Sequence, residues 1–374
     1  MAGCYIHIPF CSQKCSYCDF HFSTSKKGHV EMIHALCIEL ILRKSEWTNH
    51  QFQTLYFGGG TPSVIPTELL QKLISTFKNH YHSSKDLEIT LECNPENCSA
   101  TQLQSWKNIG ISRLSMGVQS FNDSQLQWMN RIHSARDSKL AIQRAKDVGF
   151  DELNIDLIYG LPNMTLAEWD EQLDQLLAFN PEHISAYCLT VESKTSLAKW
   201  VQNGKIQVPS SDEQAVQFER LVEKLGAHGY EQYEISNFCR NQHYSKHNTS
   251  YWKGELYAGI GPSAHGFTGT KRYWNVPNNT MYLKKISMGE LPQTIEELSI
   301  FDQFNEKIMI GLRTKWGVSK KELLQYMELP EKWLKQIEVL KELNLLVELE
   351  GCYFLTSKGR LVADNVASEL FILE

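Results

Sequence analysis

Three cysteines near the start of the chain have a spacing that suits metal chemistry. Cys11, Cys15 and Cys18 follow the pattern C-x3-C-x2-C inside CYIHIPFCSQKCSYCDF, residues 4–20. Structural zinc usually takes four ligands, often as two C-x2-C pairs, and no second pair follows here. Ferredoxin-type runs are spaced C-x2-C-x2-C and supply four thiolates to a cluster. The pattern favours a [4Fe–4S] cluster held by three thiolates, with zinc or a chance group of buried cysteines as alternatives.

A cube held by three cysteines has one iron without a protein ligand. That iron can chelate a small molecule, and S-adenosylmethionine offers an amine and a carboxylate for this purpose. Electron transfer into its sulfonium would break a C–S bond and yield an adenosyl radical, which is chemistry of the cofactor that the protein only positions. Cys4, in contrast, lies in an apolar strand pattern. We expect it to pack in the core.

Composition limits the kind of protein that carries these thiols. The 374 residues suffice for a barrel-sized domain and a smaller one, and 42% of them are hydrophobic. The start of the chain lacks a basic, apolar leader pattern, and there is no apolar run of eighteen residues. We therefore expect a cytoplasmic protein, peripheral to a membrane at most, whose ten cysteines stay reduced. A net charge of −6 does not favour a nucleic-acid partner.

The elements that must position the cysteines alternate between strand and helix patterns. Predicted strands are 4–9, 54–60, 88–94, 113–119, 152–160 and 183–189, and predicted helices include 29–44, 67–80, 137–149, 166–179 and 212–229. Thr67 and Asp137 look like N-caps, and Gly149 looks like a helix stop. This alternation indicates an α/β fold with a parallel sheet. We expect a partial, open β/α barrel of about six units, with a doubly wound sheet as the alternative.

The second half of the chain changes character twice. Residues 230–280 are rich in aromatic residues, Gly, Pro and Asn, and residues after 300 read as three helices followed by a hairpin that turns at Glu350 and Gly351. That order is typical of a winged helix. We therefore expect a barrel over 1–235, an extension over 236–295 and a winged-helix-like α+β domain over 296–374.

Polar residues at the ends of the predicted strands should converge. Residues at the carboxyl ends of successive parallel strands meet on one face of a barrel, where active sites lie. The residues at these ends are Cys11, Gly59, Glu92, Gln119 and Asp156. Five motifs that are distant in sequence can therefore form one pocket around the cysteines.

Five motifs together carry a family resemblance. CYIHIPFCSQKCSYCDF, YFGGGTP, LECNPE, SMGVQSF and NIDLIYGLP resemble, in this order, the radical S-adenosylmethionine family that contains oxygen-independent coproporphyrinogen III oxidase. The resemblance spans about residues 1–290. It implies a first S-adenosylmethionine at Tyr5, Gly59 and Glu92, and a second at Gly60, Thr61, Gln119, Arg131 and Asp156. Tyr17 is expected to pack on the cluster or the adenine, with a plain core role as the alternative.

Within this family, three features resemble the HemW-type heme chaperone branch. Phe20 stands where the oxidases typically have a fourth cysteine, the first strand begins near residue 4, and KHNTSYW (246–252) matches an H-N-x-x-Y-W heme-binding motif. The resemblance implies that His247 binds heme iron through imidazole, and that Asn248, Tyr251 and Trp252 orient the ring or stack on the porphyrin. His243 and His265 remain competing ligands.

The resemblance implies a heme chaperone that carries a [4Fe–4S] cluster, one or two S-adenosylmethionine molecules and heme. Implied partners are a heme acceptor, such as a membrane respiratory enzyme, and an electron donor for the cluster, with a homodimer as an option. Coproporphyrinogen oxidase is the alternative function, although we expect no such activity. An RNA-modifying radical enzyme is a weaker alternative, because residues 301–374 contain more acidic than basic side chains.

Overall fold

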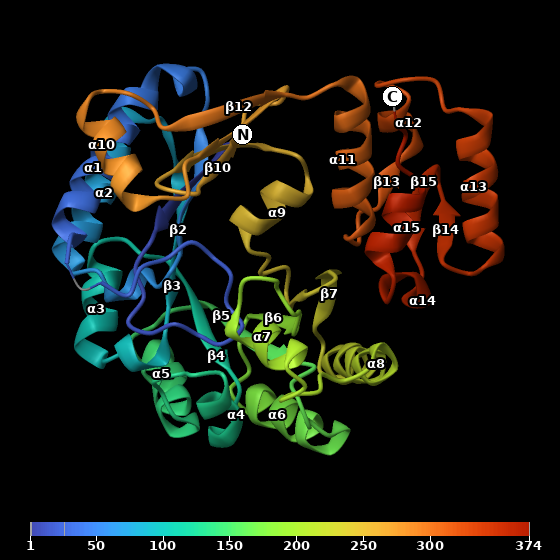
Figure 1. The fold of residues 1–374 in the computed structure, drawn as a ribbon, viewed down its shortest axis with the longest axis horizontal. Coiled ribbons are helices and arrows are strands. Elements are labelled where there is room, and N and C mark those ends of the chain that lie inside the picture. The colour runs from blue at the N-terminus through green and yellow to red at the C-terminus, as the bar shows by residue number, and fades with distance from the viewer. Residues whose placement is uncertain (1, 26, 374) are drawn as a thin grey trace.

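The core of the molecule is one curved sheet that begins with six parallel strands. The structure is a computed structural model, and it describes residues 2–25 and 27–373. The parallel strands run in sequence order across the sheet, and they are β1 (Ala2–Ile8), β2 (Phe52–Gly59), β3 (Ser83–Cys93), β4 (Arg113–Gln119), β5 (Glu152–Tyr159) and β6 (His183–Cys188). This arrangement confirms the predicted open β/α barrel of six units (Figure 1).

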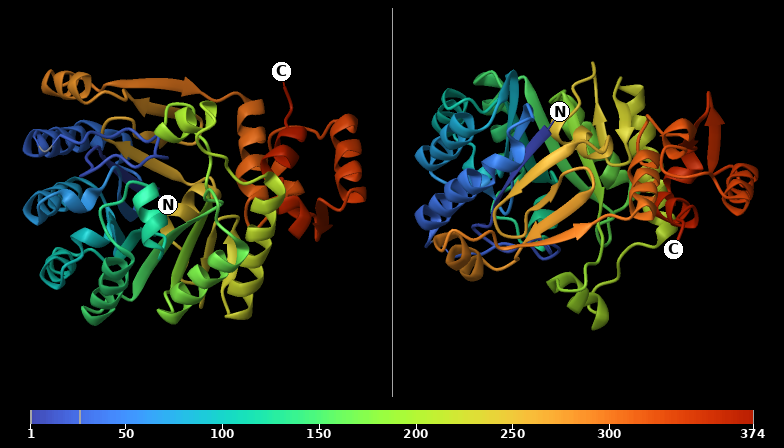
Figure 2. Two further views of the ribbon diagram at one scale, coloured as in Figure 1. Left: turned by 60° about the horizontal axis from the view of Figure 1, so that its bottom comes forward. Right: turned by 90° about the horizontal axis from the view of Figure 1, so that it is seen from above.

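Helices between the strands cover the outer face of this sheet. They are α1 (His29–Arg43), α2 (Thr67–His80), α3 (Ala100–Asn108), α4 (Asp123–Trp128), α5 (Ala135–Asp147), α6 (Leu166–Ala178) and α8 (Ser211–Ala227). The short helix α7 (Ser196–Gln202) lies instead beside the cysteine loop, where the Leu197 N–H donates to the Ser16 carbonyl at 2.9 Å. Figure 2 shows the blue-to-green helices on the outside of the curve, with the red C-terminal unit on the opposite side. These helices leave the inner face of the sheet uncovered, so a functional site can lie there.

Two of the predicted helix caps are wrong. Helix α2 has Pro66 at its N-cap, so Thr67 is already the first helical residue. Helix α5 is capped by Ser134, whose hydroxyl accepts from the Asp137 N–H while the Asp137 carboxylate accepts from the Ser134 N–H. Asp137 is thus the third residue of a capping box. The stop at Gly149 is confirmed, because this residue follows the end of α5 with φ +85°.

The sheet continues beyond both ends of the parallel set. Strand β9 (Leu256–Ile260) pairs in parallel with the free side of β1, and the antiparallel strands β10 (His265–Phe267), β11 (Lys271–Asn275) and β12 (Gln293–Glu297) follow it. At the other end, β8 (Asn237–Cys239) pairs with β6 and with β7 (Glu231–Glu234). The boundary we expected at residue 235 therefore falls inside the β7–β8 hairpin.

The C-terminal unit has its own hydrophobic core, which includes Phe304, Trp333 and Leu340. Its elements are α11 (Ile300–Leu312), β13 (Val318–Ser319), α12 (Lys320–Leu323), α13 (Glu331–Glu342), β14 (Leu346–Leu349), β15 (Cys352–Leu355), α14 (Ser357–Arg360) and α15 (Ala363–Glu369). The predicted order of three helices and a hairpin is confirmed, and Glu350 and Gly351 turn the hairpin with positive φ. No helix in the described ranges is long and apolar enough to cross a bilayer.

Candidate functional site

Alternate residues of the central strands point to the inner face of the sheet. On β1, Cys4, Ile6 and Ile8 are completely buried, whereas Tyr5 and His7 lie on the opposite face and line a cavity. The expectation that Cys4 packs in the core agrees with this placement. His7 was not identified from the sequence, although its spacing of two residues from Tyr5 places both side chains on one face.

Glu92 on β3 is tied to the neighbouring strand β2. The Tyr56 hydroxyl donates to Glu92 Oε1 at 2.8 Å, and the Gly59 N–H donates to Glu92 Oε2 at 3.2 Å. On β5, Asp156 Oδ1 accepts from Asn154 Nδ2 at 2.7 Å. Two predicted carboxylates are thus fixed on one face by neutral donors, with no cation paired to Glu92 among the described residues.

Burial makes both carboxylic acids weak. Desolvation, with a smaller contribution from the nearby Asp156, raises the pKa of Glu92 to about 7 against the opposing hydrogen bonds from Tyr56 and Gly59. Desolvation likewise raises the pKa of Asp156 to about 6. Such a pair suits a ligand that brings its own positive charge, because an ammonium group would compensate the buried negative charge.

The Gly58-Gly59-Gly60 turn is packed too closely for side chains. Gly59 has φ +109°, and a Cβ there would lie 2.5 Å from the His7 ring. A Cβ at Gly60 would lie 2.5 Å from the Phe10 carbonyl oxygen. These glycines therefore let β2 end directly against the first strand and its cysteine loop.

The cysteine loop follows β1 and is held by residues from later motifs. Thr61 Oγ1 donates to Cys11 Sγ at 3.4 Å, and Arg131 Nη1 donates to Cys15 Sγ at 3.4 Å. All three motif thiols are free and half-buried. Burial raises the pKa of Cys11 to about 11 and that of Cys18 to about 12, so the thiols must lose protons when they bind a metal.

These contacts suit a cluster, because iron–sulfur centres are tuned by hydrogen bonds to their sulfurs. Within residues 2–25 and 27–373, no three Cys, His, Asp or Glu side chains converge as the ligands of a single metal ion would.

Arg131 links the cysteine loop to the ends of β3 and β4. Its Nη2 donates to Asn94 Oδ1 at 2.7 Å and to the Gly117 carbonyl at 2.8 Å. A Cβ at Gly117 would lie 3.0 Å from Gln119 Nε2 and 3.4 Å from Arg131 Nη2, so these two predicted residues lie beside one another. Tyr17 is partly buried against the core, and burial raises its pKa well above its usual value.

The H-N-x-x-Y-W motif forms a short helix, α9 (Lys246–Trp252), on the inner side of the sheet (Figure 1). His247 is 1% exposed. Its Nδ1 lies 2.6 Å from Thr54 Oγ1, and its Nε2 lies 2.8 Å from the Tyr251 hydroxyl. Burial lowers the pKa of His247 to about 3. Both ring nitrogens of this neutral imidazole are therefore engaged, and neither is free for iron in this conformation.

The other members of the motif point in different directions. Tyr251 lines the cavity, whereas His247, Asn248 and Trp252 do not. The Trp252 ring lies 5.5 Å from the Arg313 guanidinium, and its buried Nε1 has no hydrogen-bond partner among the described residues. His243 is remote from the cavity lining and is paired with Glu152 at 2.7 Å. The structure thus brings one of four motif residues to the cavity.

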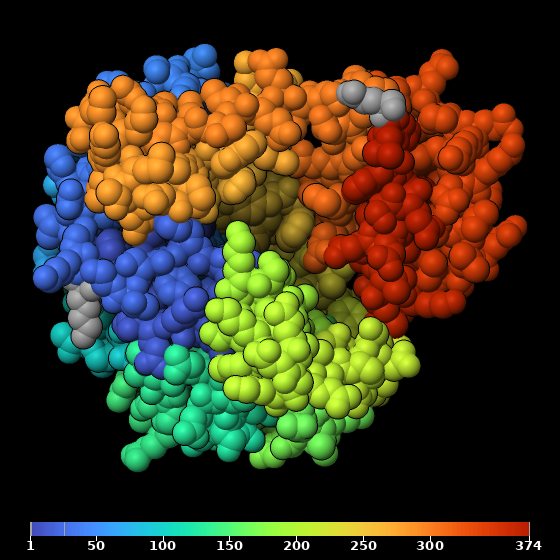
Figure 3. Space-filling model, viewed as in Figure 1, coloured from blue at the N-terminus to red at the C-terminus, as the bar shows by residue number. Residues whose placement is uncertain are grey.

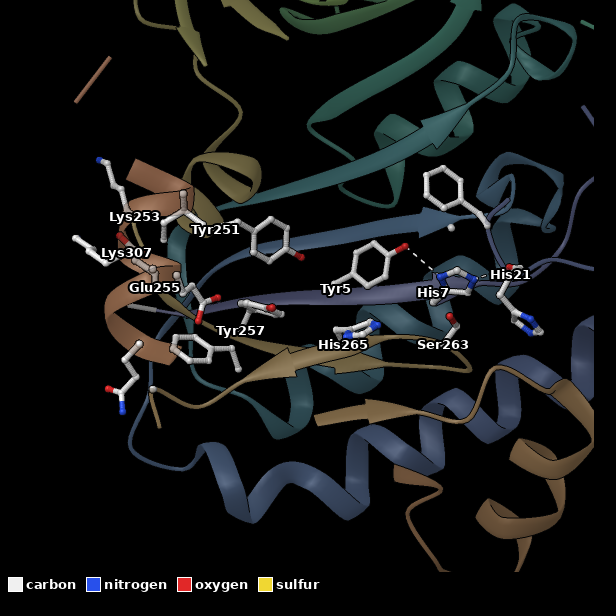
Figure 4. Close-up of a pocket in the computed structure, with 18 of the residues that line it drawn as sticks. Tyr5, His7, His21, Tyr251, Lys253, Glu255, Tyr257, Ser263, His265 and Lys307 are labelled. Carbon is white, nitrogen blue, oxygen red and sulfur yellow. Dashed lines mark hydrogen bonds between the residues drawn. The ribbon is translucent and has the colours of Figure 1, made fainter. Parts of the chain in front are cut away.

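A cavity of about 670 Å³ lies between the inner face of the sheet and the C-terminal unit. Figure 3 shows this side of the molecule hollowed, with dark yellow residues at the bottom of the hollow. Figure 4 shows Tyr5 and His7 pointing into the cavity from β1, with His265 beside them and Lys253 and Lys307 at the other end. The cavity also touches Glu92 and Gly59, so it is continuous with the site of the predicted carboxylates.

Several cavity residues were missed by the sequence reasoning. They are His7, His21, Lys253, Tyr257 and Lys307. Alternation along β1 could have identified His7. The lysines come from the end of α9 and from α11, and only the three-dimensional arrangement brings them together.

This sheet, with its three-cysteine loop and the strand-end residues beside it, defines a radical S-adenosylmethionine protein. Residues 5–176 match the model of the Radical SAM superfamily, and residues 299–362 match that of the HemN C-terminal domain. The fold is similar to that of the coproporphyrinogen III oxidase HemN from Escherichia coli, with a TM-score of 0.85 and 22% identity over 99% of this chain and 90% of that one. At this level of identity, the similarity to HemN shows a shared fold alone.

Relatives of nearly equal length define the family further. The chain is 35% identical to the heme chaperone HemW of Bacillus subtilis over 98% of both chains. It is 34% identical to the heme chaperone HemW of Haemophilus influenzae, over 99% of this chain and 97% of the relative. It is also 32% identical to the mitochondrial radical S-adenosyl methionine domain-containing protein 1 of Danio rerio, over 96% of this chain and 82% of the relative. The chain belongs to the heme chaperone HemW family.

Proposed function

We propose that this protein is a heme chaperone that binds heme and delivers it to an acceptor protein. The observation that carries the proposal is the similarity, over almost the whole chain, to proteins named heme chaperone HemW. The cavity beside the cysteine loop supports it, because a volume of about 670 Å³ lies within the range of about 300–1,000 Å³ that is usual for small-molecule and cofactor sites.

The proposal includes a [4Fe–4S] cluster on Cys11, Cys15 and Cys18, with S-adenosylmethionine beside it. When bound, these groups supply one-electron chemistry at an iron that the protein does not ligate. Thr61 and Arg131 donate to two of the thiol sulfurs and would keep these ligands in place. Among the predicted ligands, Glu92 and Gly59 lie on the cavity with Tyr5.

Arg131, Gln119 and Asp156 are proposed to serve a second S-adenosylmethionine together with Gly60 and Thr61. The positions of these residues support the proposal. Arg131 donates both to Cys15 Sγ and to the Gly117 carbonyl, and it lies beside Gln119. Asp156 offers a carboxylate that is oriented by Asn154 and Ser115. Tyr17, whose ionisation is opposed by burial between Cys15 and Cys18, is proposed to pack on the cluster or the adenine.

The remaining parts of the proposal concern partners and place. An electron donor would reduce the cluster, and the heme acceptor would be a protein such as a membrane respiratory enzyme. The chaperone would act in the cytoplasm and would bind peripherally to the membrane during heme delivery. The C-terminal unit offers a separate surface for an acceptor or for a second copy of the chain.

The test is an anaerobic comparison of heme binding and coproporphyrinogen decarboxylation by the reconstituted full-length protein. We expect about four irons per chain, stoichiometric binding of added hemin and no decarboxylation. Replacing Cys11, Cys15 and Cys18 together by Ala should remove the iron and the broad absorption near 400 nm, because a methyl group cannot replace a thiolate. The matched control is Cys4→Ala, which should keep the cluster because Cys4 is buried on the far side of β1.

Two results would contradict the proposal. Wild-type protein that does not bind hemin is no heme chaperone, and sustained decarboxylation would instead indicate a coproporphyrinogen oxidase. Retention of about four irons by the triple cysteine variant would refute the cluster assignment alone.

A further inference from the structure

We propose that heme occupies the part of the cavity between β9, β10 and α11, next to the S-adenosylmethionine proposed at Tyr5, Gly59 and Glu92, and that His265 on β10 binds its iron. This inference rests on the proposed heme-carrying function and goes beyond it by naming the site and the iron ligand. It differs from the expectation drawn from the H-N-x-x-Y-W motif, which assigned the iron to His247.

Among the other histidines near the cavity, His7 and His247 have partners on both ring nitrogens, and His21 has a partner on one. His7 Nε2 donates to the His21 carbonyl at 2.8 Å, and His7 Nδ1 accepts from the Tyr5 hydroxyl at 3.2 Å. His21 Nε2 is hydrogen-bonded to Asn279 Oδ1 at 2.7 Å. His247 has partners on both nitrogens and does not line the cavity. Iron coordination by His7 or His247 would therefore require breaking existing hydrogen bonds inside the protein.

His265 differs from these histidines in exposure and in its partners. Its side chain is exposed and lines the cavity, and its ring has no hydrogen-bond partner among residues 2–25 and 27–373. Figure 4 shows it in the middle of the row of cavity residues, between Tyr257 and Ser263. An imidazole with free nitrogens, placed centrally in a cavity, is suited to reach the iron at the centre of a porphyrin.

The His265 ring also contacts an aromatic side chain on the neighbouring strand. His265 is paired across the sheet with Trp274 on β11, and their rings stack with centroids 6.1 Å apart and an interplanar angle of 27°. Cross-strand contacts of this kind fix the orientation of a side chain on a strand. The imidazole is thus presented by a strand that is paired on both sides, with β9 and with β11, which favours binding because less ordering is needed.

Apolar side chains around His265 suit the flat face of a porphyrin. Phe267 lies two residues further along β10 and Tyr257 on β9, and both line the cavity. Phe20 lines it as well and is 68% exposed, which is high for a phenylalanine beside a cavity. Burial of these rings against a large apolar ligand would be favourable.

The charges in the cavity indicate how the ring is oriented. Lys253 and Lys307 are the cations among the described lining residues, and both lie at the end next to α11. Glu255 and Glu306 lie there too, and two of these four groups have partners outside the cavity lining: Glu306 is paired with Arg272, and Lys307 is paired with Glu322 at 2.9 Å. We therefore place the two propionates at the α11 end, with the apolar edge of the ring toward Phe20 and the cysteine loop.

The test is hemin titration of the reconstituted full-length protein, followed by the Soret band in the ferric and ferrous states. Wild type is compared with His265→Ala, His265→Met, His247→Ala and the matched control His243→Ala, whose residue lies outside the cavity. We expect His265→Ala to weaken binding at least tenfold and to shift the Soret maximum, with the wild-type spectrum restored by added imidazole. His265→Met should shift the ferrous spectrum because a thioether replaces the imidazole.

In His247→Ala the Soret maximum should stay at the wild-type wavelength, although affinity falls because Tyr251 loses its partner. His243→Ala should match wild type in both measurements. An unchanged Soret maximum in both His265 variants would overturn the inference, and so would a shift confined to His247→Ala. If wild type itself bound no hemin, the proposed function would fail. If wild type bound hemin and the His265 variants kept its spectrum, only the assignment of His265 would fail. Iron content and far-ultraviolet circular dichroism verify that each variant is folded.

Discussion

Glu92 is a carboxylic acid whose environment opposes its charge. It receives two hydrogen bonds from neutral donors, yet burial and the nearby Asp156 raise its pKa to about 7. A raised pKa means that the folded protein binds this proton more tightly than the unfolded chain does. The stabilisation is complete below pH 4.5, the ordinary value, and it is lost as the pH rises through about 7.

We therefore predict that Glu92 contributes a loss of stability to the ligand-free protein between pH 5 and pH 8, opposite in sign to the contribution of buried histidines such as His247, whose pKa is lowered by burial. The contribution of Glu92 is at most about 3 kcal/mol, at 1.36 kcal/mol for each unit of pKa. Glu92→Gln cannot ionise, and its one amide oxygen can accept from the Gly59 N–H while its Nε2 group donates to the Tyr56 hydroxyl. Relative to wild type, its free energy of unfolding should therefore fall less over this range. Urea unfolding of apo protein at several pH values measures the difference.

The control is Glu331→Gln, at a side chain that is 83% exposed, which should leave the pH dependence unchanged. A residual slope is expected in the Glu92 variant, because burial also raises the pKa of Asp156 to about 6. Parallel pH curves for wild type and Glu92→Gln would show that Glu92 does not carry this proton.

For single side chains, the sequence predicted the chemical role better than the contacts in the folded protein. Cys11, Cys15 and Arg131 were selected by motif, and the structure places Arg131 against Cys15. For His247 the residue type suggested an iron ligand, whereas its neighbours Thr54 and Tyr251 occupy both nitrogens. A sequence motif shows which residue types occur together, but partners 193 residues away are set only by the folded sheet.

At the scale of elements, strand β9 shows how a missing side chain shapes the cavity. Gly259 lies opposite Tyr5 in the β1–β9 register. A Cβ at this position would be 1.8 Å from the His265 carbonyl oxygen. The close approach of β9 to the chain at His265 therefore depends on glycine, and that approach sets where His265 enters the cavity.

We predict that Gly259→Ala forces the two segments apart. Overpacking of this kind costs about 1–3 kcal/mol of stability, and hemin affinity should fall with it because His265 is displaced. The matched control is Gly226→Ala in α8, where a Cβ would meet nothing within 4 Å. That change should stabilise the protein by up to about 1 kcal/mol, since alanine favours helix. Equal urea midpoints for the two variants would contradict this reading of β9.

The elements that were predicted well are those with long, regular patterns. Strand β4 occupies residues 113–119 as expected, and α1 and α2 agree within one residue. Strands β9 to β12 were not predicted. Each has five or fewer residues, and the pairing of β9 with β1 joins segments about 250 residues apart. Local periodicity carries no information about such pairing, and this is why the expected extension is in fact part of the sheet.

At the scale of the whole molecule, Arg313 joins the C-terminal unit to the sheet. Its guanidinium is 3.1 Å from Glu234 Oε1 and 2.8 Å from Asp364 Oδ1. The Glu234 side chain is 1% exposed, whereas that of Asp364 is 82% exposed. The contact with Glu234 is therefore the one that matters, because an unpaired buried carboxylate is costly.

We predict that Arg313→Ala lowers the free energy of unfolding by about 2–4 kcal/mol, whereas Asp364→Ala changes it by less than about 1 kcal/mol. Hemin affinity should fall in the first variant only, because Lys307 and Ile310 on α11 line the cavity. Urea unfolding and hemin titration of both variants test this. Similar losses in the two variants would show that the interface does not depend on the buried partner.

The position of β1 between β2 and β9 has a consequence for biosynthesis. Strand β1 leaves the ribosome before β2, which can pair with one of its edges early. Its other edge must wait for β9, roughly 200 residues later, which at about 5–20 residues per second takes roughly 10–40 s. During that interval the nascent chain presents an unpaired, largely apolar strand directly before the cysteine loop. Co-translational assembly of this sheet is therefore slow for topological reasons, and the cluster loop is made well before β9 completes the sheet beside it.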